Sequence, residues 1–190
     1  MKRLIVGISG SSSPNLGIRF LEVLRDRSEV ETHLVLSDSV EKTLAYEAPQ
    51  WSVEKLRGLA HHSYPVKNLA APIASGSFPV DAMVVIPCSM RSLAAIAHGF
   101  GDNLLTRAAD VTLKERRPLV LVTRETPLNL AHLRNMTAVT EMGGVILPPV
   151  LAFYHRPQTV QDLVDHTVGK VLDVLKIPHE LFRRWQGQEK

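Results

Sequence analysis

Short apolar, β-branched runs alternate with segments of helical periodicity along this 190-residue chain. In one such segment Leu16, Phe20, Leu21 and Leu24 share a helical face. The apolar runs predict strands at residues 4–9, 32–36, 82–86, 119–122 and 145–147. The segments between them predict helices at residues 16–24, 39–46, 51–60, 90–97, 103–116, 128–142 and 159–175. Strands that alternate with helices pair in parallel, and the crossover helices cover both faces of the sheet.

The predicted fold is therefore a single-domain, doubly wound parallel α/β sheet, Rossmann-like or flavodoxin-like. A chain of this length suits one domain, residues 1–190, with a C-terminal tail from about residue 178, after Ile177-Pro178 ends the last helix. Residues 68–79 are rich in Ala, Pro, Gly and Ser and predict an irregular loop within that domain. In such sheets ligands bind beyond the carboxyl ends of the strands, where the strand order reverses. The residues after each strand therefore matter most.

Composition excludes several functional classes. The longest apolar runs, such as residues 82–87, are too short to cross a bilayer, and we expect no membrane span and no signal peptide. A single cysteine, Cys88, excludes an internal disulfide and fits the reducing cytoplasm. The net charge is +3, but the basic residues are scattered apart from Glu115-Arg116-Arg117 and form no stripe. We therefore expect a small-anion site and no nucleic-acid binding.

Two strand-to-helix loops carry small hydroxyl residues. After the first strand comes Ser9-Gly10-Ser11-Ser12-Ser13-Pro14, in which Gly10 permits a tight turn, Ser13 suits an N-cap and Pro14 suits the first helical turn. This loop is either a phosphate cradle or a serine-capped turn, and it contains no dinucleotide or P-loop motif. After the strand at 82–86 comes Pro87-Cys88-Ser89-Met90-Arg91-Ser92. Cys88 has no neighbouring histidine and is predicted to be structural.

Charged residues gather in two places. Arg107 and Lys114 are seven residues apart on a predicted helix, about 10 Å along one face, with Asp110 between them. Such a stripe is usually a solvated ion-pair face. Arg124-Glu125, however, follows the strand at 119–122 and so lies at the expected ligand edge, which favours a basic pocket.

Metal binding is not predicted. The chain has eight histidines but no H-x-x-x-H or H-E-x-x-H motif. His61-His62 is expected to lack a nearby carboxylate or thiolate partner, so we do not expect a zinc site. From residues alone, the chain is predicted to be an anion- or nucleotide-binding α/β domain with a basic pocket.

A series of short motifs, in order, resembles the UbiX family of flavin prenyltransferases over nearly the whole chain. The overall pattern is most similar to the subgroup described as the B subunit of phenolic-acid and hydroxyarylic-acid decarboxylases. The motifs are Ser75-Gly76-Ser77, Pro87-Cys88-Ser89, Arg107-Ala108-Ala109-Asp110-Val111, Leu113-Lys114-Glu115-Arg116, Arg124-Glu125, Phe153-Tyr154-His155 and Trp185.

The resemblance implies a flavoprotein that transfers a dimethylallyl group from dimethylallyl phosphate to N5 and C6 of reduced FMN. The product, prenylated FMN, would serve a UbiD-type aromatic acid decarboxylase, and a flavin reductase would supply the reduced FMN. The resemblance also implies a homo-oligomer, a dodecamer, with sites at subunit contacts.

Carried over position by position, the resemblance assigns roles to individual residues. The FMN-binding positions are Gly10, Ser11, Ser12, Ser37, Ser89, Met90, Arg91, Ser92 and Arg124. The positions for the allylic substrate are Ser75, Arg107, Lys114, Arg124, Glu125, Tyr154, Lys170 and Trp185. The catalytic candidates are Ser12, Glu47, Lys114 and Glu125. Four basic side chains would replace the Mg²⁺ of diphosphate enzymes, so the implied reaction is metal-independent.

Two departures and two rival functions accompany the resemblance. Ser13 stands where the family usually has a second glycine, and Thr123 stands where it usually has proline. One rival is a non-catalytic FMN carrier or assembly subunit of the decarboxylase. The other is a flavin-dependent cysteine decarboxylase, whose Pro-Ala-Ser-Ala-Asn-Thr signature is replaced here by residues 73–77.

Overall fold

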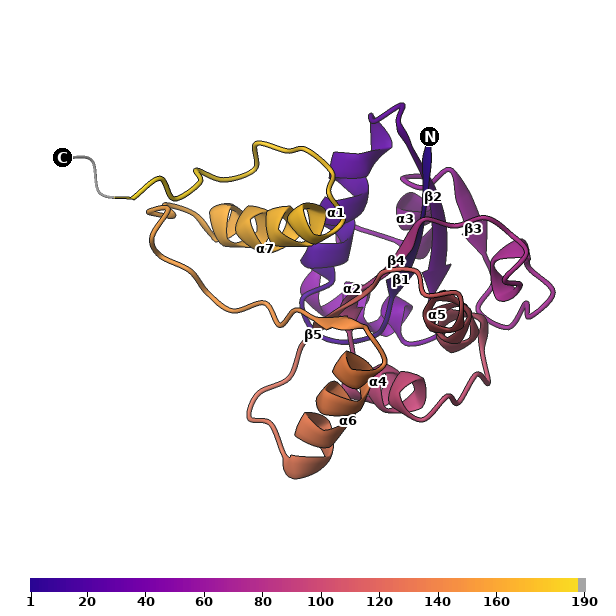
Figure 1. Ribbon diagram of the computed structural model, residues 1–190. Helices are drawn as coiled ribbons and strands as arrows, with labels where there is room; N and C mark the ends of the chain where they lie inside the picture. The colour runs from indigo at the N-terminus through magenta and orange to yellow at the C-terminus, as the bar shows by residue number, and fades with distance from the viewer. Residues whose placement is uncertain (188–190) are drawn as a thin grey trace.

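A single parallel sheet organises the computed structural model, which describes residues 1–187 (Figure 1). The strand order is β3-β2-β1-β4-β5-β6, and every neighbouring pair is parallel. The strands are β1 (Lys2–Ile8), β2 (Val30–Leu36), β3 (His62–Tyr64), β4 (Ala82–Cys88), β5 (Leu119–Thr123) and β6 (Val145–Ile146). The order reverses between β1 and β4, and this switch point is where a doubly wound sheet binds ligands.

Helices cover both faces of the sheet because successive strand residues point to opposite sides. Leu4, Val6 and Ile8 of β1 pack with α1, α2 and α7, whereas Ile5 packs in a second core with α4 and α5. The helices are α1 (Pro14–Arg25), α2 (Val40–Glu47), α3 (Val53–Arg57), the 3₁₀ turn η1 (Pro72–Ala74), α4 (Met90–Ala97), α5 (Leu104–Lys114), α6 (Leu130–Glu141) and α7 (Val160–Val174). The predicted doubly wound α/β fold is confirmed.

Two local expectations were wrong. A helix was predicted over residues 51–60, but the helix in this region, α3, is shorter. No strand was predicted in the segment that follows, but His62–Tyr64 forms the edge strand β3. The edge strand is short and largely polar, so it lacks the apolar alternation by which strands are recognised. β3 nevertheless pairs with β2 in parallel through residues 62–64.

The chain after β6 first runs along the outside of the molecule and then returns over α7 (Figure 1). Val150, Leu151 and Phe153 on the outer segment are 69%, 60% and 68% exposed, which is unusual for large apolar side chains so close together. The tail is fastened by Asp173 of α7, which accepts hydrogen bonds from Arg184 (2.7 Å) and pairs with His179 (3.1 Å). The Arg184 contact lowers the pKa of Asp173. Within residues 1–187 no helix is both long and apolar enough to cross a membrane.

Candidate functional site

The loops after β1 and β4 are joined at the switch point by side chain-to-backbone hydrogen bonds. Ser9 Oγ donates to the Pro87 carbonyl at 2.9 Å, and the Ser89 backbone N–H donates to Ser9 Oγ at 2.7 Å. Ser9 is 2% exposed, so these bonds are protected from water. They hold the amino ends of α1 and α4 side by side, and helix amino ends favour anions.

Two further loops join this pair. Gly10 N–H donates to Ser37 Oγ at 3.0 Å, and a Cβ on Gly10 would lie 2.3 Å from Ser39 Oγ, so only glycine lets the loop after β2 approach this closely. Ser11 Oγ donates to the Arg124 carbonyl at 3.2 Å, which attaches the loop after β5. Four strand-to-helix loops therefore meet at one edge, and they carry most of the residues expected to bind FMN.

Glu47, at the carboxyl end of α2, contacts the first loop directly. Its Oε2 accepts hydrogen bonds from Ser12 Oγ at 3.0 Å and from the Ser13 backbone N–H at 2.8 Å. The two catalytic candidates Ser12 and Glu47, which are far apart in sequence, are thus in contact.

Ser13 occupies the N-cap position of α1 but does not cap it with its side chain. Its backbone is left-handed, with φ 71° and ψ 48°, a region that favours glycine. This geometry explains why glycine is usual at the position, and it corrects the expectation of a serine N-cap. The other departure, Thr123, is buried, and its Oγ1 has no hydrogen-bond partner within residues 1–187.

We expect Ser13→Gly to stabilise the protein by about 0.5–1 kcal/mol. Relief of the left-handed strain of roughly 1–2 kcal/mol exceeds the entropy that glycine loses on folding. The thermal midpoint should rise by about 1–4 °C. Ser28→Gly, at a position without positive φ, is the control and should not raise it. A midpoint for Ser13→Gly at or below that of the parent protein would contradict the strain argument.

A cleft of about 670 Å³ opens between the loops after β2 and β4, and Gly10, Ser11, Ser12 and Arg124 are not among its lining residues. Ser37, Ser89, Arg91 and Ser92 line it, together with the first turn of α5, so four of the expected FMN residues face one cavity. Its volume is in the range of cofactor sites. Serine hydroxyls, an arginine and the amino end of α4 form a donor set that fits a phosphate-bearing ligand. The Met90 side chain instead packs against the core.

A second group of candidates lies along α5. Arg107 donates to the Ala74 carbonyl at 3.2 Å and pairs with Asp110 at 2.7 Å, which is one ion pair of the stripe Arg107, Asp110 and Lys114. At the end of the helix Lys114 forms an ion pair with Glu115, which lowers the pKa of Glu115. Both side chains are next to Gly76, where a Cβ would lie 2.1 Å from Glu115 Oε1 and 2.7 Å from Lys114 Nζ. The Ser75 loop is thereby placed beside Lys114.

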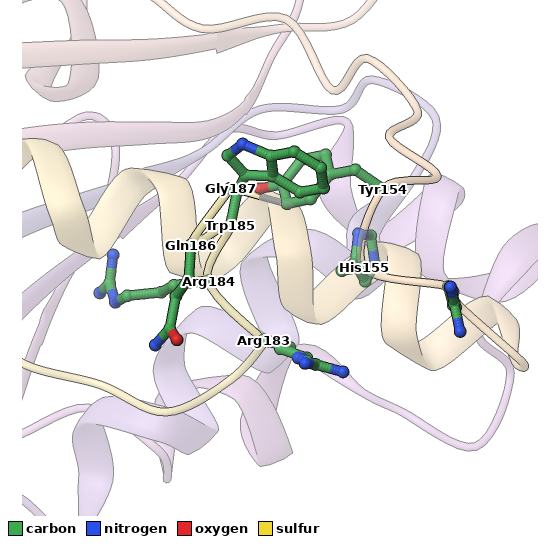
Figure 2. A pocket seen from close by; sticks show the side chains of 8 residues that line it. Tyr154, His155, Arg183, Arg184, Trp185, Gln186 and Gly187 are labelled. Atoms are coloured by element: carbon green, nitrogen blue, oxygen red, sulfur yellow. The ribbon is translucent and has the colours of Figure 1, made fainter. Parts of the chain in front are cut away.

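A third group is formed by Tyr154, Lys170 and Trp185. Figure 2 shows the rings of Tyr154 and Trp185 side by side, and their centroids are 6.4 Å apart, edge to face. They line a pocket of about 430 Å³ that also contains Arg156, Arg183 and Arg184. Tyr154 Oη is 2.9 Å from His166 Nε2, a contact that the sequence did not suggest. Lys170 lies one helical turn from His166 and 3.5 Å from Asp173.

One chain does not bring these groups together. Lys114 ends the helix that leads into β5, whereas Arg124 and Glu125 follow that strand. The five residues of β5 therefore separate Lys114 from Arg124 by about 16 Å along the sheet. Glu125 is exposed and accepts a hydrogen bond only from the neighbouring Thr126 N–H among its bonds in residues 1–187. Within one chain Lys114 and Arg124 therefore lie at opposite ends of β5, and the expected basic pocket stays a prediction.

Cys88 and the histidines complete the account of the candidates. Cys88 is fully buried, and desolvation raises its thiol pKa to about 12, which supports a structural role. The expectation that His61-His62 lacks a carboxylate partner was wrong for His62, whose Nε2 lies 3.0 Å from Glu31 Oε1. The sequence hid this contact because it depends on the pairing of β2 with β3.

Comparisons with known proteins agree with this geometry. The Flavoprotein family profile matches residues 1–179. The chain is 54% identical over 189 residues to the flavin prenyltransferase UbiX of Salmonella typhimurium, covering 98% of this chain and 100% of the relative. AnUbiX, crystallised with FMN and dimethylallyl pyrophosphate, superimposes with a TM-score of 0.95 at 49% identity, over 99% of each chain.

A dodecameric FMN-dependent UbiX-like decarboxylase from Escherichia coli O157:H7 superimposes equally well, with a TM-score of 0.95 and 49% identity over 97% of this chain and 100% of that one. A family profile over residues 1–179 and a relative that is 54% identical over 98% of this chain fix the family. The chain belongs to the flavoprotein family and, within it, to the UbiX-type flavin prenyltransferases.

Proposed function

We propose that this chain transfers a dimethylallyl group from dimethylallyl phosphate to N5 and C6 of reduced FMN. The observation that carries the proposal is the meeting of four strand-to-helix loops at the switch point, two of which line a cleft of about 670 Å³. The relative AnUbiX was crystallised with FMN and a dimethylallyl donor at 49% identity, which supports the same substrates here.

The flavin half of the site is assigned to the four loops. Ser37, Ser89, Arg91 and Ser92 line the cleft and would bind FMN, with its phosphate at the amino end of α4. Gly10, Ser11 and Ser12 of the first loop would lie along the isoalloxazine ring. Met90 would contribute its backbone, because its side chain belongs to the core.

The allylic half needs more than one chain. Arg107, Lys114 and Ser75 form one group on α5, and Tyr154, Lys170 and Trp185 form another beside α7. Departure of phosphate leaves its negative charge with the phosphate group and cationic character on the allyl carbon, so a basic cage and dry aromatic walls suit the reaction. We infer that these groups complete the flavin loops of neighbouring chains in a homo-oligomer, as a dodecameric relative suggests.

Proton transfer is assigned to Glu47. It contacts Ser12 in the loop proposed to lie along the flavin, whereas Glu125 is exposed and bonded only locally in the described part of the chain. Ring closure adds a proton to the dimethylallyl double bond, forms the bond to C6 and releases the C6 proton, so a group that exchanges protons at this position is needed. With the flavin ring along the first loop, the Glu47 carboxylate would accept the proton that C6 loses.

Partners follow from the product. Prenylated FMN would pass to a UbiD-type aromatic acid decarboxylase, and a flavin reductase would supply reduced FMN, both in the cytoplasm, where the free thiol of Cys88 is stable. A non-catalytic FMN carrier, the main rival, has no need of the basic and aromatic groups on α5 and α7.

The decisive experiment is anaerobic incubation of the protein with FMN, a chemical reductant and dimethylallyl phosphate. Mass spectrometry of the released flavin should show FMN with one added five-carbon unit, and FAD in place of FMN should give no prenylated product. Recovery of unmodified FMN, bound but unchanged, would favour the carrier instead.

Prenylation is expected to continue at its normal rate after dialysis against EDTA. The charge of the leaving phosphate is neutralised by lysine and arginine side chains in this proposal, and no metal is required. Initial rates before and after chelation check the prediction. A loss of turnover that Mg²⁺ restores would show that a metal ion neutralises the leaving group.

A further inference from the structure

Three potential metal ligands meet where β2 pairs with the edge strand β3. His33 and His62 are direct partners in the parallel register, and Glu31 precedes His33 by two residues and so shares its face. Glu31 Oε1 lies 3.0 Å from His62 Nε2 and 3.3 Å from His33 Nε2. The three atoms lie within 4.8 Å of one another, and residues 1–187 contain no second such group of three.

His33 carries an unusual buried nitrogen. The residue is 1% exposed, and its Nε2 has no hydrogen-bond partner within the described chain although it faces Glu31 Oε1. Its Nδ1 is engaged with Tyr64 Oη at 2.9 Å, and Phe78 packs edge-on against the ring. A buried nitrogen that faces a carboxylate without a hydrogen bond is costly, and a cation between them would remove that cost.

We propose that Glu31, His33 and His62 bind a divalent transition-metal ion, foremost Zn²⁺, at a site separate from the flavin pocket. Zinc binds imidazole nitrogen and carboxylate oxygen at about 2.0–2.2 Å, so two ligands of a tetrahedral ion lie roughly 3.3–3.5 Å apart. The observed separations of 3.0 and 3.3 Å are close to that value. Two imidazoles and one carboxylate suit zinc better than Mg²⁺ or Ca²⁺, which prefer oxygen.

Two of the proposed ligands, His33 and Glu31, each have a further hydrogen-bond partner that orients the side chain, as in other metal sites. Tyr64 holds His33 through Nδ1, and Arg3 Nε lies 3.0 Å from Glu31 Oε2, so that Oε1 is the oxygen that faces the two histidines. The His62 side chain is 51% exposed, so the ion has a path from solvent and an open coordination position.

The plain alternative is the contact of Glu31 Oε1 with His62 Nε2 as it stands, and it requires no metal.

The ion would act as a clip on the edge of the sheet. β3 pairs with β2 through only three residues, and a metal bound by His62 and by two residues of β2 would fasten this short strand. The proposed ligands are side chains of β2 and β3, whereas the flavin loops lie beyond the carboxyl ends of the strands. Removal of the metal should therefore loosen the β3 edge of the sheet without stopping prenylation.

The test uses full-length protein without a polyhistidine tag, dialysed against EDTA. Zn²⁺ titrated in competition with a chromophoric chelator should bind at about one equivalent per chain, and Co²⁺ should give the absorption of a tetrahedral ion. His62→Gln should weaken zinc binding at least about tenfold, and Tyr64→Phe about tenfold through the lost second partner. His61→Asn is the matched control, because His61 is bonded to Thr32 and lies outside the cluster.

Melting curves give a second measurement. Excess zinc should raise the thermal midpoint of the parent protein and of His61→Asn but not that of His62→Gln. If His62→Gln does not fold, Glu31→Gln replaces it. Zinc affinity that is unchanged in the folded cluster variant, or no stoichiometric zinc in the parent protein, would overturn the proposal and leave the contact of Glu31 with His62 as it stands.

Discussion

Replacement of Lys114 by alanine is expected to slow prenylation about 30- to 1,000-fold, while FMN affinity hardly changes. A charge-assisted contact that strengthens as phosphate departs contributes about 2–4 kcal/mol to the transition state, which sets this range. FMN affinity is spared because Lys114 lies at the opposite end of β5 from the flavin loops of its own chain. The measurements are single-turnover prenylation at saturating flavin and FMN titration.

Lys55→Ala is the matched control, because Lys55 is an exposed helical lysine whose Nζ bonds only to the Gln50 carbonyl in the described part of the chain. It should turn over at the parent rate. A Lys114→Ala protein that melts normally and also turns over at the parent rate would remove Lys114 from the site. Loss of FMN binding in the same variant would instead assign the basic group to the flavin phosphate.

Mixed oligomers test whether neighbouring chains share the pocket. Lys114→Ala and Arg124→Ala chains should each prenylate FMN at least about 30-fold more slowly than the parent when assembled alone. After they are unfolded together and reassembled in equal amounts, about one quarter of the pockets should combine an intact flavin loop with an intact lysine. No recovery in a properly assembled mixture would mean that both residues serve the same chain.

Glu47→Gln is expected to reduce the rate of prenylation by about 100-fold or more, the usual contribution of a positioned general base. The amide oxygen can still accept the hydrogen bonds from Ser12 and Ser13, so the loop keeps its shape, but the side chain can no longer take a proton. Rates at saturating substrates measure the effect, and a melting curve confirms folding.

Two further variants show whether a slower rate in Glu47→Gln reflects the loss of a general base. Glu41→Gln, an exposed change on the same helix, should leave the rate unchanged. Glu125→Gln should cost less than Glu47→Gln, because Glu125 bonds only to its own backbone neighbour in residues 1–187. If Glu47→Gln prenylates FMN within about twofold of the parent rate, the loss is smaller than a general base usually contributes. The role of general base would then belong to Glu125 or to the departing phosphate.

The sequence predicted the parts of the fold that periodicity encodes. The run at 82–86 became β4, and the alternation of strands and helices gave the parallel sheet. β3 was missed because three polar residues at an edge carry no apolar alternation. The contact of Glu31 with His62 was missed for the same reason, because it depends on the register of β2 with β3 and not on spacing in the sequence.

The candidate site could likewise be predicted only in part. Loops after strands were expected to meet, and the bonds from Ser9 to Pro87 and from Ser11 to Arg124 join three of them. Spacing along α5 placed Arg107 and Lys114 on one face, but it gave no sign that β5 would separate Lys114 from Arg124. Which residues meet across chains is a property of the assembly, and one chain's pattern does not encode it.

The separation of Lys114 from Arg124 makes the catalytic unit a contact between chains on the proposed arrangement. Exposed Val150, Leu151 and Phe153 offer apolar surface with which such a contact can form. Activity per milligram is then a function of protein concentration, because dilution below the dissociation constant of the assembly dismantles pockets while leaving every chain folded. A cell that makes too little of this protein would lose more than a proportionate share of its catalytic capacity.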